Sequence, residues 1–82
     1  MSLPASQLTG IGLLVTTATT VYRRVFAAHP DQGRELWLSV ERLKDVSLPG
    51  ARDAAELPAR EVETRARLSE ALRVEGANGA AP

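Results

Sequence analysis

No charged side chain precedes Arg23 in this chain, and the stretch GIGLLVTTATTVY that leads up to it is apolar and rich in threonine. A run of this composition can form a membrane-spanning helix, a β-strand or the buried side of a soluble helix. These three structures belong to different kinds of protein. The stretch therefore constrains the fold more than any other feature of the sequence.

The spacing of the apolar residues favours an amphipathic helix over residues 5–28. Apolar side chains recur at intervals of three and four residues, which places them along one side of an α-helix. The threonines and the Arg23-Arg24 pair fall mostly on the opposite side. Because a helix surrounded by lipid needs no polar side, the periodicity favours packing against protein. The apolar positions are Ile11, Leu14, Val15, Ala18, Val21, Tyr22 and Val25.

Two other interpretations of this stretch stay open at the level of sequence. Residues 3–22 reach the length of a single-pass membrane helix if one proline and five threonines are counted in. The β-branched residues between positions 13 and 26 favour a strand instead. In that case 21–26 pairs with 35–43 in a hairpin around 21–43, which makes the fold α+β.

A second helix is predicted over 34–46. The His29-Pro30 dipeptide disfavours helical geometry at the histidine, and Asp31 has the chemistry of a residue that caps a helix N-terminus. Beyond it, the apolar residues again share one side, with charged residues opposite. They are Leu36, Trp37, Val40 and Leu43.

A third helix is predicted over 58–74, after the turn sequence SLPG at 47–50. Glutamate precedes arginine by four residues in Glu61–Arg65 and Glu63–Arg67, a spacing typical of a solvated helix. The remaining apolar side is small. It consists of Val62, Ala66, Leu68 or Ser69, and Leu72. We expect residues 1–75 to form one small, mainly α domain of two to three helices, in an open bundle or an extended helical subunit, followed by a flexible tail over 76–82.

The composition points to burial against other proteins. A chain of 82 residues buries only about 60% of the surface that it exposes when unfolded. It contains three aromatic residues and no cysteine, and His29 is its single histidine, so neither a disulfide nor a zinc site compensates for the small core. The ten basic and ten acidic residues cancel, and no basic cluster predicts nucleic-acid binding. Protein partners, identical or foreign, are the expected source of the missing burial.

No motif of catalysis, cofactor binding or metal binding is complete. Gly10 and Gly12 resemble the start of a dinucleotide-binding fingerprint, but Val15 stands where a third glycine is needed. His29, Asp31 and Ser39 are the residue types of a hydrolytic triad, yet they lie near one another in a turn region without a nucleophile motif. We therefore expect no catalytic, cofactor-binding or metal-binding residues.

The sequence predicts a non-enzymatic subunit that packs amphipathic helices against partner proteins in a larger complex, such as a virion or another multi-subunit assembly. It is expected in the cytoplasm or within that assembly, because Met1 to Gln7 lacks the basic residues of a secretory signal. Two alternatives are a single-pass membrane accessory subunit and a small soluble regulator or inhibitor of a protein. No resemblance to a family is specific enough to name. The predicted contact residues are Val15, Tyr22, Phe26, Trp37 and Leu43.

Overall fold

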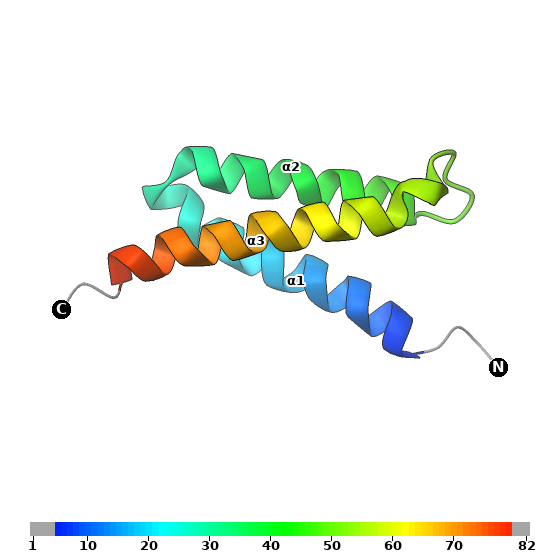
Figure 1. Ribbon diagram of the computed structural model, residues 1–82, viewed down its shortest axis with the longest axis horizontal. Helices are drawn as coiled ribbons and strands as arrows, with labels where there is room; N and C mark the ends of the chain where they lie inside the picture. Colours follow the sequence, from blue (N-terminus) through cyan, green and yellow to red (C-terminus); the bar gives the residue numbers. More distant parts are fainter. Residues whose placement is uncertain (1–4, 80–82) are drawn as a thin grey trace.

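The computed structural model describes residues 5–79 and is mainly α, as predicted. Its elements are α1 (Ala5–Ala28), α2 (Pro30–Ser47), the short 3₁₀ turn η1 (Ala54–Glu56) and α3 (Leu57–Gly79). Figure 1 shows α2 and α3 side by side along most of their length, with α1 crossing them obliquely. The N-terminal half of α1 diverges from the other two helices in this view.

The core lies where all three helices meet, and its side chains are aliphatic. Helix α1 contributes the apolar side that the sequence predicts, and α2 adds Leu36 and Val40, both with no exposed surface. Helix α3 contributes little more than Ala71 and the half-buried Leu68. The shared core of these helices consists of Ala18, Val21, Val25, Leu36, Val40 and Ala71.

Helices α1 and α2 are joined through the single residue His29. Its backbone N–H donates to the carbonyl of Val25 (2.7 Å), and its carbonyl accepts from the N–H of Gly33 (3.0 Å). The last turn of α1 and the first turn of α2 therefore share one residue. Pro30 occupies the start of α2, where the missing N–H costs nothing because the first amides of a helix have no intrahelical acceptor.

Gly33 allows the two helices to approach closely at this corner. A Cβ at Gly33 would lie 2.8 Å from the Cα of Phe26 and 2.9 Å from its Cβ. Carbon atoms at that separation overlap, so α1 and α2 keep their spacing only with glycine at this position.

The hairpin that the sequence allowed around 21–43 is wrong. Both of its segments are helical in the structure, because their apolar residues pack with the helical period against a common core. Helix α2 also begins four residues earlier than predicted, at Pro30. Asp31 is consequently a first-turn residue and not the cap, and the capping position, His29, makes no side-chain capping bond.

The third helix was predicted correctly as a helix, but the prediction of its buried side was wrong. The helix begins at Leu57, directly after η1, and continues to Gly79, beyond the predicted end at Val74. Its fully buried residues are Thr64 and Ala71, whereas Val62 is 68% exposed and Leu72 is 43% exposed. Residues 80–82 of the predicted flexible tail lie outside the described residues.

Candidate protein interface

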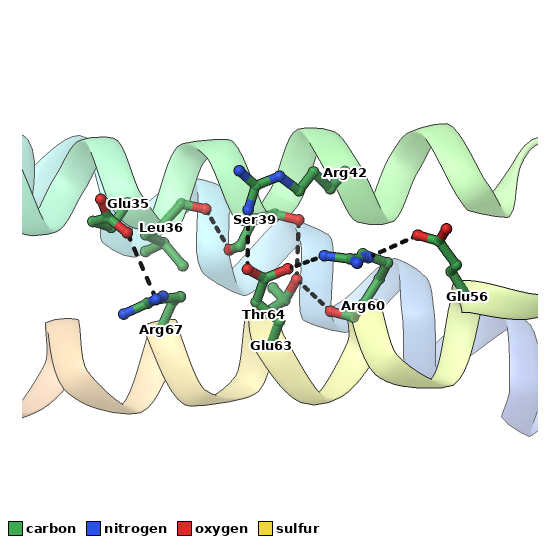
Figure 2. A network of polar contacts seen from close by, with 9 residues as sticks. All are labelled: Glu35, Leu36, Ser39, Arg42, Glu56, Arg60, Glu63, Thr64 and Arg67. Atoms are coloured by element: carbon green, nitrogen blue, oxygen red, sulfur yellow. Dashed lines mark hydrogen bonds and ion pairs between the residues drawn. The ribbon is translucent and has the colours of Figure 1, made fainter. Parts of the chain in front are cut away.

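The contact between α2 and α3 is polar at its centre, and we call it the polar seam. Figure 2 shows the hydroxyl of Thr64, on α3, within 3.1 Å of the Ser39 carbonyl on α2 and 2.9 Å from the Arg60 carbonyl of its own helix. The Ser39 hydroxyl donates to the carbonyl of Leu36 at 2.7 Å. Thr64 and Ser39 have essentially no exposed surface, and these bonds satisfy both hydroxyls.

Ion pairs extend the polar seam on either side of Thr64. Glu63 accepts from Arg42 of α2 (3.0 Å) and from Arg60 of α3 (2.7 Å), and Glu35 of α2 lies 3.7 Å from Arg67 of α3. The predicted pair Glu63–Arg67 is therefore replaced by contacts across the seam, since both residues face α2. The predicted pair Glu61–Arg65 is present at 3.8 Å.

The contact between α1 and α2 carries the aromatic residues of the chain at its outer edge. The ring centroids of Tyr22 and Phe26, one turn apart on α1, are 5.5 Å apart, and that of Trp37 on α2 lies 5.1 Å from Tyr22. These separations are those of interacting aromatic pairs. Tyr22 and Trp37 are half-buried, and Phe26 remains 41% exposed. We call Tyr22, Phe26 and Trp37 the aromatic seam.

The aromatic seam lies on the side of the α1–α2 pair that faces away from α3. Arg24, which reaches α3, follows Tyr22 by two residues, and Glu35, which also reaches α3, precedes Trp37 by two. Two residues correspond to about 200° around an α-helix. The rings on α1 and on α2 therefore point away from the side that α3 covers.

Positive charge borders the aromatic seam. The Lys44 ammonium lies over the Trp37 ring, 6.0 Å from its centroid, and 3.6 Å from Glu41 of the same helix. Arg34, one turn before Trp37, lies 3.7 Å from Asp31. Arg23, one turn before Phe26, is exposed and makes no ion pair within residues 5–79.

The structure brings together three of the five predicted contact residues and aligns a fourth with them. Tyr22, Phe26 and Trp37 form the aromatic seam, and the half-buried Val15 lies two turns before Tyr22 on the same side of α1. Leu43 has no exposed surface and is packed inside the chain. The candidate surface thus consists of the aromatic seam and Val15, and it does not include Leu43.

Sequence reasoning missed the border of the surface. The sequence places Arg23 on the polar side of the first helix, or at the membrane boundary in the single-pass alternative, and it does not connect Lys44 with Trp37. The spacing of seven residues between Trp37 and Lys44 places them two turns apart on one side of α2, and this spacing was a usable signal. The pairing of Tyr22 with Trp37 had no local signal, because it depends on how α1 and α2 pack.

A groove of about 450 Å³ lies between α2 and α3, lined by charged residues that include Asp31, Glu35, Arg67 and Glu70. Each of its carboxylates has an arginine partner in Arg34, Arg67 or Arg73. The side-chain hydrogen bond from Arg73 lowers the pKa of Glu70 below its ordinary value of 4.5. A general acid near neutral pH needs the opposite shift, so this groove has the chemistry of a solvated surface.

Within residues 5–79, no helix is both long enough and apolar enough to cross a membrane. No buried side-chain nitrogen or oxygen among these residues lacks a hydrogen-bond partner. Comparison with protein-family models, with curated protein sequences and with solved structures finds no match to this chain.

Proposed function

We propose that this chain is a non-enzymatic subunit that joins a larger protein assembly, and that it does so through the aromatic seam. One observation carries the proposal. The only tyrosine, phenylalanine and tryptophan of the sequence form one cluster at the edge of the core, where Tyr22 packs against the core and Phe26 is exposed, while the fully buried core consists of leucine, valine and alanine. Aromatic side chains bury the largest apolar areas and are enriched at the energetic centres of protein interfaces.

Leaving three aromatic rings partly exposed to water lowers the stability of the protein unless another surface covers them. A small aliphatic core supplies little stability in a domain of this size, and three aromatic residues are its largest available source of buried area. Here that area stays partly in contact with water. The other large exposed aliphatic side chains are single residues distributed over α1, α2, the loop after α2, and α3, and single exposed apolar residues are normal. They are Leu13, Leu38, Leu48, Val62 and Leu72.

The polar groups of the molecule support a role in binding. The buried hydroxyls of Ser39 and Thr64 are committed to hydrogen bonds between or within helices, and the carboxylates of the groove are paired with arginine. The half-buried rings are the surface feature that these contacts leave unused.

Site-specific photo-crosslinking in the cells of origin tests this proposal. A photoreactive phenylalanine analogue at position 26 is expected to give a discrete crosslinked product with a partner chain, because Phe26 is the most exposed ring of the seam. The same analogue at Val62, an exposed position on α3, serves as the control. Absence of a product at position 26, or equal products at both positions, would contradict the proposal.

A further inference from the structure

We infer that the occupant of the aromatic seam is an amphipathic α-helix of a partner protein, with glutamate or aspartate on both flanks of its apolar stripe. This inference rests on the proposed function and specifies its partner. It is carried by two observations, the geometry of the seam and the sign of the charges around it.

The geometry fits a helix. Both walls of the seam are helices whose backbone groups bond internally, so the surface offers no sheet edge to which a strand adds. The exposed part runs along α1 from Val15 to Phe26, about 16 Å at 1.5 Å per residue. That length matches about three turns of a helix lying in the valley between α1 and α2, as a fourth helix lies in a bundle.

The cations around the aromatic seam suit a partner helix that carries carboxylates. Arg23 has no ion-pair partner among residues 5–79, and Arg34 and Lys44 have only the long contacts with Asp31 (3.7 Å) and Glu41 (3.6 Å). Glu41, one turn after Trp37, is paired with Lys44. A partner helix with acidic flanks meets Arg23 on one side and Arg34 and Lys44 on the other.

The same charges argue against two other occupants. If two copies of this chain paired seam to seam, the carboxylates that each copy brings, Asp31 and Glu41, would already be paired with Arg34 and Lys44. Arg23, which makes no ion pair within residues 5–79, would then meet no free carboxylate. An anionic membrane surface would satisfy the cations, but helices that bind membranes insert projecting apolar side chains. Within the seam, Phe26 alone is exposed, at 41%, whereas Tyr22 and Trp37 are half-buried against each other.

A designed peptide provides the test, because Trp37 is the only tryptophan and reports on the seam by its fluorescence. The probe is a labelled helical peptide of about 16 residues, roughly 24 Å long, with a leucine stripe flanked by glutamate. The matched probe replaces every glutamate with lysine. Peptide anisotropy and Trp37 emission are measured with the full chain. The glutamate peptide is expected to bind at least about fivefold more tightly than the lysine peptide.

Charge reversal at one residue sharpens the test. R23E is expected to remove most of the preference for the glutamate peptide, whereas R52E leaves that preference unchanged. Arg52 is the matched control, since it is exposed, lies outside the helices and likewise makes no ion pair among residues 5–79. Circular dichroism confirms that both variants are folded.

Several outcomes would overturn the inference. They are equal affinity for the two peptides, a preference for the lysine peptide, a dimer in sedimentation equilibrium that F26D dissociates, and binding to phosphatidylglycerol vesicles without binding to either peptide. Each leaves the crosslinking result at position 26 intact, so the proposed function would stand with another occupant. Failure of the crosslink would instead reject the proposed function, and with it the partner inferred here, whatever the peptide preference.

Discussion

Helix α2 contacts α1 along one side and α3 along the other, and the two contacts use different chemistry. The polar seam with α3 is built from hydroxyls and ion pairs that satisfy one another, with Thr64 bonded to the Ser39 carbonyl and Glu63 shared by Arg42 and Arg60. The contact with α1 is built from aliphatic and aromatic side chains around a glycine. Hydrogen bonds fix how two helices align, whereas apolar burial is non-directional.

This difference singles out the surface that we propose for a partner. In the polar seam the hydroxyls and charged side chains already have hydrogen-bond or ion-pair partners within the chain. A further contact at its edge would therefore add little binding free energy. At the outer edge of the α1–α2 contact, Tyr22, Phe26 and Trp37 each bury only part of their area, and the neighbouring Arg23 has no partner within residues 5–79. The same helix thus has its polar groups satisfied on one side and carries incompletely buried aromatic rings on the other.

The largest effect is expected from G33A, which breaks the apolar contact. The added Cβ would lie 2.8 Å from the Cα of Phe26, a backbone atom that yields only if α1 moves. We expect a net loss of about 2 kcal/mol in the free energy of unfolding, since overpacking outweighs the gain in helix propensity. Urea unfolding followed by Trp37 fluorescence measures it.

Gly12 provides the matched control for that substitution. It also lies within a helix, but a Cβ there meets nothing within 4 Å. G12A is therefore expected to raise the free energy of unfolding by about 0.5 to 1 kcal/mol through helix propensity alone. If both substitutions stabilise the protein, α1 and α2 do not approach each other as closely as described.

A smaller effect is expected from T64V, which removes the hydroxyl at the centre of the polar seam. The shape is retained and the bond to the Ser39 carbonyl is lost, so we expect a decrease of about 1 kcal/mol in the free energy of unfolding. T64S, which keeps the hydroxyl, is the control for the chemistry. Amide hydrogen exchange should rise at the α2–α3 contact more than at the α1–α2 contact. A uniform rise would mean that the two contacts are not distinct.

The sequence was informative where burial follows helical periodicity. The apolar sides of α1 and α2 recur every three to four residues, and those residues form the core. It was misleading for α3, where apolar Val62 and Leu72 stay at the surface while Thr64 is buried. A buried threonine is tolerated only because the Ser39 and Arg60 carbonyls accept from its hydroxyl, and those acceptors are known only once the helices are packed.

The candidate surface shows the same limit of prediction from local sequence patterns. The residues Tyr22 and Phe26 are one turn apart, so spacing alone predicts their contact, and both are predicted contact residues. The apolar character of Leu43 predicts a contact residue as well, but Leu43 is fully buried because it faces the interior of the bundle. Whether an apolar residue ends in the core or at its edge depends on the crossing of α1 over α2, which no local pattern specifies.

The smallest expected effect concerns the ion pair that joins α1 to α3. Arg24 donates to both carboxylate oxygens of Glu75 at 2.7 and 2.8 Å, and this hydrogen bond lowers the pKa of Glu75 below 4.5. Because the folded pKa lies below the unfolded one, the stabilising contribution is present above about pH 4.5 and is lost as the pH falls through the folded pKa.

In R24Q the midpoint of the Glu75 carboxyl, followed by NMR, is expected to rise toward 4.5. Glu70 is the internal control, since its pKa is lowered by Arg73 of the same helix and should not change. If apolar packing holds α1 in place, the ring-current shifts between Tyr22 and Trp37 persist in this variant. Their loss would mean that the pair Arg24–Glu75 positions α1, and that α1 depends on polar contacts as α3 does.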